Sequence, residues 1–131
     1  MEVIMLEHIG ITINRESDID NFYKELLGLK EVRKFDLYRE FSETLFGISD
    51  TVAVTYLSGD DLFVELFLTG TKQTPVYNHI CFSVPERDSF VEKAESMGFP
   101  VTRIERESRD DLIFIRDNSG NIFEIKSRQE T

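Results

Sequence analysis

Hydrophobic and polar residues alternate in two stretches of the chain, LEHIGITI at residues 6–13 and YNHICFSV at residues 77–84. The third residue of each stretch is a histidine, His8 in the first and His79 in the second. The apolar faces consist of Ile9, Ile11 and Ile13 in the first stretch, and of Ile80, Phe82 and Val84 in the second. A period of two predicts half-buried β-strands, with each histidine on the face opposite the apolar residues.

A helical pattern follows each predicted strand. The first helix is expected from a cap at Ser17 or Asp18 to Gly28, and the second from Pro85 to Gly98. Their apolar stripes are Ile19, Phe22, Tyr23, Leu26 and Leu27 in the first helix, and Phe90, Val91, Ala94 and Met97 in the second. From the histidine to the closing glycine there are 20 residues in the first half and 19 in the second. This agreement indicates an internal repeat.

Each half ends in a strand that carries a glutamate between apolar residues, Glu65 in LFVELFL and Glu124 in NIFEIKS. The turn sequences SGDD and DNSGN precede these strands, and Gly120 in the second is expected to have a positive φ. Two further strands are expected in each half, at Lys30–Phe35 and Thr51–Leu57, and at Val101–Arg106 and Leu112–Arg116. The chain therefore predicts the order β-α-β-β-β twice.

This order predicts an α+β fold with one βαβββ module at residues 1–70 and a second at residues 71–131. The two modules are expected to form one domain with a shared, incompletely closed curved sheet around a cleft. The loop at residues 69–77, with Gly70 and Pro75, is the expected joint. The segment Leu37–Ile48 predicts an extra helix, whose Tyr38, Phe41 and Phe46 either cover the cleft or fill the core.

The two histidines and the two glutamates occupy equivalent positions of the repeat. His8 and His79 are the only histidines of the chain. Each glutamate lies between apolar strand residues, where a charged side chain needs a partner. Two imidazoles and two carboxylates are a suitable ligand set for one divalent transition metal, with positions left open for water or substrate. The predicted metal ligands are His8, Glu65, His79 and Glu124.

Composition narrows the function further. The net charge of −10 and pI of about 4.6 argue against a nucleic-acid partner, whose phosphates need a basic face, and allow a cationic ligand. No apolar run approaches the roughly 20 residues of a membrane span, and MEVIMLEHIG lacks the features of a signal peptide. Cys81 is the only cysteine, which excludes an internal disulfide and a cysteine-based zinc site. We expect a cytoplasmic protein in which Cys81 is buried and inert.

These motifs together resemble the vicinal oxygen chelate superfamily, which includes glyoxalase I, methylmalonyl-CoA epimerase, extradiol dioxygenases, and fosfomycin- and bleomycin-resistance proteins. The resemblance extends from Leu6 to Lys126 and includes LEHIGITI, DNFYKELLGLK, NHICFSV and IRDNSGNIFEI. It implies paired βαβββ modules around one metal, of which Ni, Co, Zn, Mn and Fe all accept such ligands. The His, Glu, His, Glu set is similar to that of bacterial glyoxalase I.

That resemblance implies a lyase or isomerase of the glyoxalase I type, the lactoylglutathione lyase class. Such an enzyme removes a proton next to a carbonyl, and the metal stabilises the enediolate. Glu124 is then the first candidate for the base and Glu65 the second acid/base, while His8 and His79 remain ligands. At the glutathione-binding Arg and Asn of bacterial glyoxalase I, this chain has Thr12 and Thr69, so the resemblance does not carry glutathione as co-substrate.

Three other functions stay open at this point: a methylmalonyl-CoA epimerase-like enzyme, an extradiol-type dioxygenase, and a non-catalytic drug-binding protein of the bleomycin-resistance kind. The complete ligand set argues against the last. A small-molecule substrate and a homodimer are expected. The sequence leaves undecided whether the four metal ligands come from one chain or from two.

Overall fold

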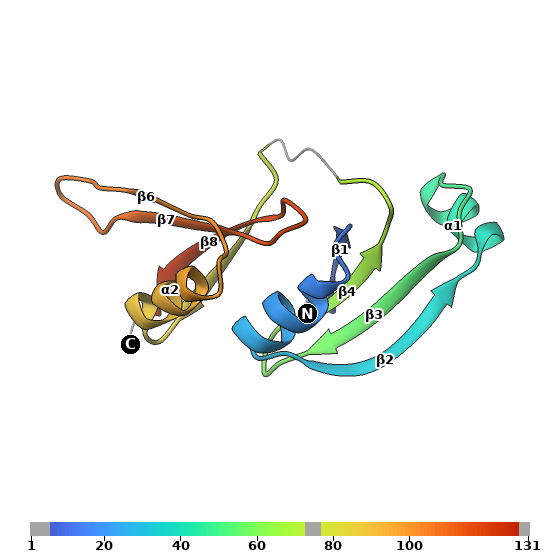
Figure 1. Ribbon diagram of the computed structural model, residues 1–131, viewed down its shortest axis with the longest axis horizontal. Coiled ribbons are helices and arrows are strands. Elements are labelled where there is room, and N and C mark those ends of the chain that lie inside the picture. Colours follow the sequence, from blue (N-terminus) through green and yellow to red (C-terminus); the bar gives the residue numbers. More distant parts are fainter. Residues whose placement is uncertain (1–5, 73–76, 129–131) are drawn as a thin grey trace, which may run out of the picture. The chain divides into compact units, whose positions relative to one another are not determined.

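The computed structural model describes residues 6–72 and 77–128, so Pro75 of the predicted joint lies outside the described residues. The chain divides into two compact units between Thr71 and Lys72. Each unit contains one four-stranded sheet, and Figure 1 shows their elements coloured along the sequence. Within the described residues, no helix is long and apolar enough to cross a membrane.

The first module has the strand order β1-β4-β3-β2. Its elements are β1 (Ile9–Ile13), the helix η1 (Ile19–Leu26), β2 (Lys30–Leu37), α1 (Arg39–Phe46), β3 (Val52–Ser58) and β4 (Phe63–Leu68). Strand β1 runs parallel to β4, and the other neighbours are antiparallel. The first and last strands of the module are therefore hydrogen-bonded neighbours.

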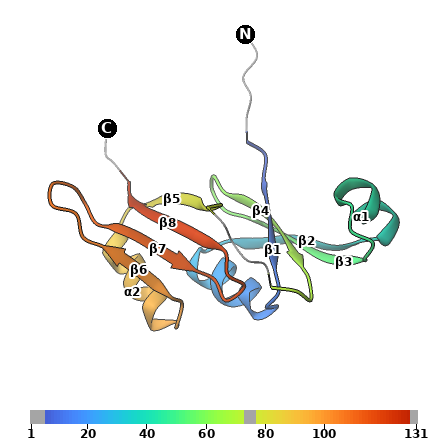
Figure 2. The same cartoon turned by 90° about the horizontal axis from the view of Figure 1, so that it is seen from above.

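The second module has the order β5-β8-β7-β6, which is the same arrangement (Figure 2). Its elements are β5 (Ile80–Val84), α2 (Arg87–Ser96), β6 (Val101–Ile104), β7 (Leu112–Arg116) and β8 (Ile122–Ser127). Strand β5 is parallel to β8. The predicted α+β fold of two βαβββ modules is confirmed, with α1 as the one addition to the first module.

The strand register gives the first sheet two distinct faces. Glu65 pairs with Gly10 on one side and with Tyr56 on the other, and Tyr56 pairs with Arg33. Residues paired across neighbouring strands point to the same side of a sheet. Glu65, Tyr56 and Arg33 therefore share one face, which we call the site face of the first module.

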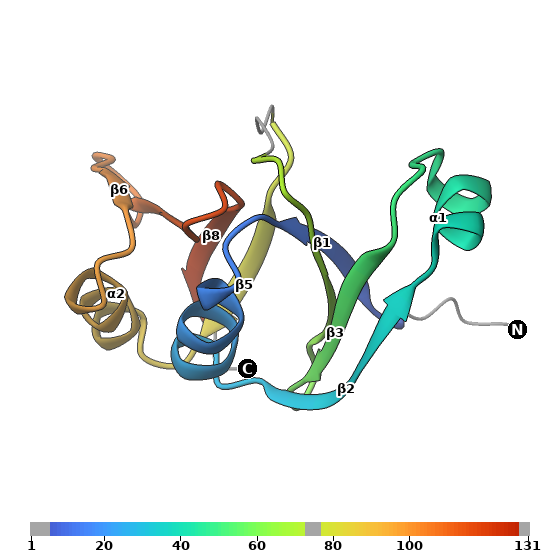
Figure 3. The ribbon, with the colours of Figure 1, turned by 45° about the vertical axis from the view of Figure 1, so that its right-hand side comes forward.

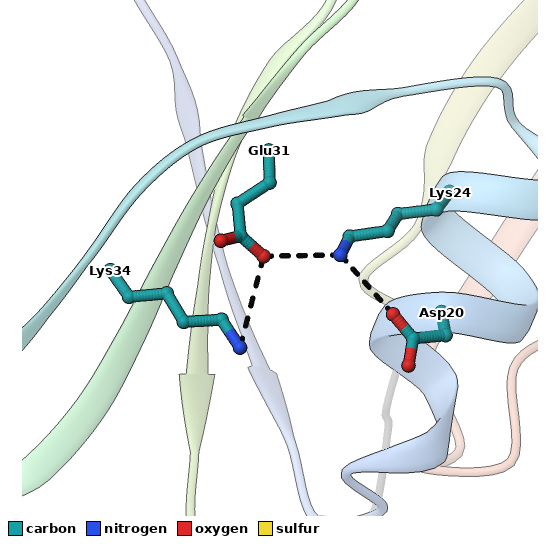
Figure 4. A network of polar contacts seen from close by, with 4 residues as sticks. All are labelled: Asp20, Lys24, Glu31 and Lys34. Carbon is teal, nitrogen blue, oxygen red and sulfur yellow. Dashed lines mark ion pairs between the residues drawn. The ribbon is translucent and has the colours of Figure 1, made fainter.

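Helix η1 lies on the opposite face, called here the helix face. Glu31 pairs with Leu57 and points to this side, where Lys24 Nζ of η1 lies 3.1 Å from Glu31 Oε1. Lys24 also lies 3.2 Å from Asp20, and Lys34 makes a longer contact of 3.8 Å to Glu31 (Figure 4). The hydrogen bonds of Lys24 to Glu31 and Asp20 raise its pKa above the usual lysine value.

The core of the first module uses the helix face of its sheet and the apolar side of η1. Its buried apolar residues include Ile11, Ile13, Leu57, Val64 and Leu66 on the strands, and Ile19, Phe22, Tyr23 and Leu26 on η1. In the second module α2 packs against β5, β6 and β8. The buried residues there include Val91, Ala94, Ile113, Ile115, Phe123 and Ile125. The opposite faces carry the polar and aromatic side chains Glu65, Tyr56 and Phe67 in the first module and Glu124 and Phe114 in the second.

The first helix is a π-helix. The amide of Leu27 donates to the carbonyl oxygen of Phe22, five residues earlier, at 2.9 Å. More residues per turn leave a smaller angle between successive side chains. The adjacent Phe22 and Tyr23 are accordingly both 0% exposed, with their ring centroids 5.0 Å apart. Gly28, with a φ of 75°, follows the helix as the sequence predicts.

The predicted extra helix is α1, which lies at the ends of β2 and β3 (Figure 3). Phe41 and Tyr38 are 60% and 58% exposed, so core filling is the wrong interpretation for them. The ring of Phe46 packs edge-on against Phe67 of β4, with centroids 5.6 Å apart. Because Phe67 lies two residues after Glu65 on the same strand, α1 contacts the site face of the first module.

Candidate metal centre

The first module brings His8 and Glu65 into contact. His8 precedes β1 by one residue, and Glu65 lies in the middle of β4, the parallel neighbour of β1. The Nε2 atom of His8 lies 2.9 Å from Oε1 of Glu65. His8 and Glu65 are 57 positions apart in sequence, and they meet because the module pairs its first strand with its last.

The second module repeats this arrangement with His79 and Glu124. The Nε2 atom of His79 lies 3.5 Å from Oε1 of Glu124. The side chains are 40% and 15% exposed, against 41% and 16% for His8 and Glu65. The two pairs therefore have the same surroundings with respect to solvent: an accessible imidazole above a mostly covered carboxylate.

A hydrogen bond orients the ring of His79. Its Nδ1 atom lies 2.9 Å from the carbonyl oxygen of Tyr77, which can only accept a hydrogen bond. Nδ1 therefore carries the hydrogen, and in the neutral ring Nε2 directs its lone pair toward Glu124. A lone pair and a carboxylate at this distance repel unless a proton or a metal cation lies between them. A hydrogen bond from the second ring nitrogen to a backbone carbonyl is typical of metal-binding histidines.

The spacing within each pair fits two ligands of one metal. Zinc-type ions hold nitrogen and oxygen ligands at about 2.0–2.2 Å, which places adjacent ligand atoms about 2.8–3.6 Å apart at angles between 90° and tetrahedral. The observed separations are 2.9 Å for His8 and Glu65 and 3.5 Å for His79 and Glu124. Within residues 6–72 and 77–128, no three or more His, Cys, Asp or Glu side chains are grouped so that they could hold a metal ion. The structure thus joins the four predicted ligands as two pairs.

Aromatic rings flank both carboxylates. Tyr56 is the β3 partner of Glu65, and Phe114 is the β7 partner of Glu124. The ring of Tyr56 meets His8 edge-on with centroids 6.1 Å apart, and Phe114 lies 5.7 Å from the ring of His79. Sequence analysis missed both aromatic residues. Their only signal is an aromatic residue nine or ten positions before each glutamate.

Cys81 corrects one prediction. It is exposed rather than buried, because it pairs with Glu124 and so lies on the polar face of its strand. Partial burial, and then the negative charge of Glu124, raise the pKa of the Cys81 thiol. The raised pKa makes this thiol less reactive as a nucleophile than an ordinary cysteine.

Comparison with protein families identifies a superfamily that matches most of the chain. The family model of the Glyoxalase/Bleomycin resistance protein/Dioxygenase superfamily matches residues 5–125. No curated protein matches the sequence.

Solved structures share the fold at low sequence identity. A fosfomycin resistance protein, FosX, from Listeria monocytogenes has a TM-score of 0.74 and 14% identity, over 98% of this chain and 96% of that one. A mutant of that protein, complexed with Mn(II) and 1S,2S-dihydroxypropylphosphonic acid, has a TM-score of 0.73 and 17% identity, over 98% of this chain and 93% of that one. A glyoxalase family protein from Enterococcus faecalis has a TM-score of 0.69 and 18% identity, over 92% of this chain and 95% of that one.

Proposed function

The chain belongs to the Glyoxalase/Bleomycin resistance protein/Dioxygenase superfamily, and from this premise we propose that it is a metal-dependent enzyme. Its two His–Glu pairs, from the first and the second module, bind one divalent metal ion together. The proposed ligands are His8, Glu65, His79 and Glu124. Open positions on the metal are left for two oxygens of a small-molecule substrate.

One observation carries this proposal: both modules form the same contact between an imidazole Nε2 and a carboxylate Oε1. A single such contact is an ordinary surface ion pair, which proteins form for little gain in stability. Repetition at equivalent positions, with matching exposure, indicates a shared role instead. The fixed tautomer of His79 supports that role, because it leaves Nε2 available as a ligand.

The reaction we propose is removal of a proton next to a carbonyl, as in a lyase or isomerase of the glyoxalase I type. A bound divalent metal supplies Lewis-acid stabilisation of charge on the substrate oxygens. Glu124, mostly covered beside Phe114, is the proposed base, and Glu65 is the second acid/base. A mostly covered carboxylate beside an aromatic ring is held in place and shielded from bulk water, which suits proton transfer.

Glutathione is a poor fit as co-substrate. The hydroxyl of Thr69 donates to the carbonyl oxygen of Thr71 at 3.1 Å, and its amide donates to Ile13 at 2.8 Å. Thr69 is thus engaged in the turn after β4. A threonine also lacks the charged fork that grips a carboxylate. We therefore propose another thiol adduct, a CoA thioester or a similar oxygen-rich compound.

A second candidate reaction follows from the solved structures. One similar chain, a fosfomycin resistance protein, is complexed with Mn(II) and a dihydroxypropylphosphonic acid, and it covers 98% of this chain. A Mn(II)-dependent enzyme acting on a phosphonate is therefore the alternative. Incubation of the Mn(II)-loaded protein with fosfomycin, followed by ³¹P NMR, separates the two. Conversion of fosfomycin would favour the reaction on a phosphonate and overturn the proposed glyoxalase-type reaction.

The chain is further proposed to act as a homodimer, in which the two pairs of one metal site come from one chain or from two. Mixed refolding of His8→Ala and His79→Ala variants distinguishes these cases. If the pairs come from different chains, mixed dimers regain one intact site and bind metal. If they come from the same chain, no mixture regains metal.

The first experiment is metal content. Wild type, His8→Ala, His79→Ala and a Glu105→Gln control are chelated, reloaded with Mn, Co, Ni or Zn, and measured by elemental analysis. Glu105 is exposed, follows the last residue of β6 and lies outside both pairs. We expect about one metal per chain in wild type and control and strong loss in both histidine variants. Wild type that takes up no metal would overturn the proposal.

A further inference from the structure

Arg33 on β2 presents its guanidinium on the site face of the first module. Its Cζ atom lies 4.7 Å from the ring centroid of Tyr56 and 5.9 Å from that of Phe35. Tyr56 in turn meets His8 edge-on at 6.1 Å, and His8 contacts Glu65. A continuous row of contacts therefore crosses the sheet, from the proposed metal ligands through one aromatic ring to a cation.

A β-bulge brings Arg33 to this face. Glu31 pairs with Leu57, and the next pair in the ladder is Arg33 with Tyr56, so Val32 is left out of the ladder. In a regular ladder Val32 would pair with Tyr56, and Arg33 would pair with Thr55 and point to the helix face. Bulges are common beside active sites, where they redirect a side chain. The extra residue here has that effect on the guanidinium.

The charge of Arg33 has no carboxylate partner among residues 6–72 and 77–128, although the chain has 25 acidic residues against 15 basic ones. Other cations of the same structure do pair, as Lys24 with Glu31 and Arg103 with Asp111. Aromatic rings hold the guanidinium of Arg33 instead. Its N–H donors, arranged as a planar fork, are therefore left for a ligand.

The second module does not repeat this part of the row. At the equivalent positions Phe114 lies opposite Glu124, and Thr102 lies opposite Phe114. The repeat thus retains the His–Glu pair in both modules, whereas only the first adds a phenol and a guanidinium. If Tyr56 and Arg33 only stabilised the sheet, the second module would not have to differ at these two positions. It indicates that Tyr56 and Arg33 meet something that the second module does not.

We propose that Arg33, positioned by Tyr56, binds an oxyanion of the substrate, either a carboxylate or a phosphate-type group. The inference rests on the proposed function, because it assigns the other end of the same molecule to the metal beside His8 and Glu65. Guanidinium forks match both kinds of anion in bidentate geometry. Strands β2 and β4 are two positions apart, about 10 Å between backbones. The substrate is thus a small anion whose charged group lies a few bonds from its metal-binding oxygens.

The test measures anion binding without metal. Inorganic phosphate and acetate are titrated separately into chelated, ¹⁵N-labelled protein at constant ionic strength, and the Nε–Hε signal of Arg33 and backbone amides are followed by NMR. Phosphate and acetate distinguish the two anion classes. We expect saturable shifts at Arg33 with at least one probe. The affinity should fall about tenfold or more in Arg33→Gln, because a charge-assisted hydrogen-bond pair is lost.

Two variants serve as matched controls. Lys34→Gln removes the same charge from the next residue of β2, which points to the helix face. Lys126→Gln removes the cation two residues after Glu124 on β8. This lysine is the alternative place in the second module where an anion could bind. Both should bind the probes within about twofold of wild type. Equal binding in Arg33→Gln and wild type would overturn the inference, as would loss of binding in Lys126→Gln alone.

Metal binding is measured on the same samples so that the two proposals fail separately. Mn(II) titration followed by electron paramagnetic resonance should give the same affinity in Arg33→Gln and wild type. Normal Mn(II) binding with unchanged anion affinity in Arg33→Gln would sink the anion site and leave the metal site standing. Saturable binding at Arg33 with no Mn(II) binding in wild type would leave the anion site standing alone.

Discussion

The Nδ1 atom of His79 donates to the carbonyl oxygen of Tyr77 at 2.9 Å, and this bond decides which ring nitrogen faces Glu124. The carbonyl belongs to the backbone two residues earlier, so the orientation depends on local chain geometry and survives side-chain substitution at Tyr77. The His79–Glu124 pair is therefore preorganised for metal binding. Its consequences can be measured without a known substrate.

Metal should stabilise the folded protein through both pairs. A ligand that binds only the native state adds about 2.7 kcal/mol to the free energy of unfolding at 100 times its Kd. We expect Mn(II) or Zn(II) to raise the Tm of the wild type by several degrees. The increment should disappear in both His8→Ala and His79→Ala. A variant that keeps the full increment would remove that histidine from the ligand set.

Glu124→Gln should remove catalysis without removing the fold. The amide keeps the size and an oxygen for the metal, and it cannot accept the substrate proton. Turnover of methylglyoxal–thiol adducts or CoA thioesters should fall at least about 100-fold, the usual contribution of general base catalysis. Glu105→Gln, which is exposed, is the control. Unchanged turnover in Glu124→Gln would refute the assignment of the base.

Asp117 should be needed for the turn that leads into β8. It is 2% exposed, and its Oδ1 accepts the amides of Ser119 and Asn121 at 3.0 and 2.8 Å. Its Oδ2 accepts Nδ2 of Asn121 at 2.8 Å. Asp117→Ala leaves these donors unsatisfied and should cost about 3 kcal/mol in urea unfolding.

The isosteric Asp117→Asn serves as the comparison. Its amide oxygen can still accept the two backbone amides, so it should cost clearly less than the alanine. A free energy of unfolding for Asp117→Ala within about 0.5 kcal/mol of the wild type would show that the turn forms without this carboxylate.

Lys24→Met should lower stability slightly and in a pH-dependent way. Lys24 joins η1 to Glu31, the residue just before the bulge, and the exposed pair is worth about 0.5–1 kcal/mol. Its folded pKa is raised above the ordinary 10.5, so the stabilisation is complete below that value and is lost as pH rises through the higher folded pKa.

Urea unfolding of Lys24→Met and wild type at pH 7 and at pH values above 10.5 checks this. The difference between the two proteins should shrink at the higher pH. Lys34→Met, whose contact to Glu31 is 3.8 Å, should have a smaller effect at pH 7. A difference that stays constant or grows with pH would contradict the assigned ion pair.

The sequence by itself determined the repeat and the elements of both modules. Alternation around His8 and His79, and the helical spacing that follows, are local signals, because strands and helices impose periods of two and about 3.6 on side-chain burial. The sequence also placed the two histidines and two glutamates at equivalent positions of the repeat, without predicting which histidine contacts which glutamate. Parallel pairing of the first and last strands then brings each pair together.

The tertiary structure alone decided the rest. Arg33 was one of several basic residues with no distinguishing pattern, and only the ladder between β2 and β3 shows that Val32 is bypassed. The exposure of Cys81 and the contact of His79 with Tyr77 likewise depend on where neighbouring backbone lies. Periodicity records which side of an element is buried. Register, bulges and tautomers are set by hydrogen bonds to specific partners, and a one-residue shift in register turns a side chain to the other face.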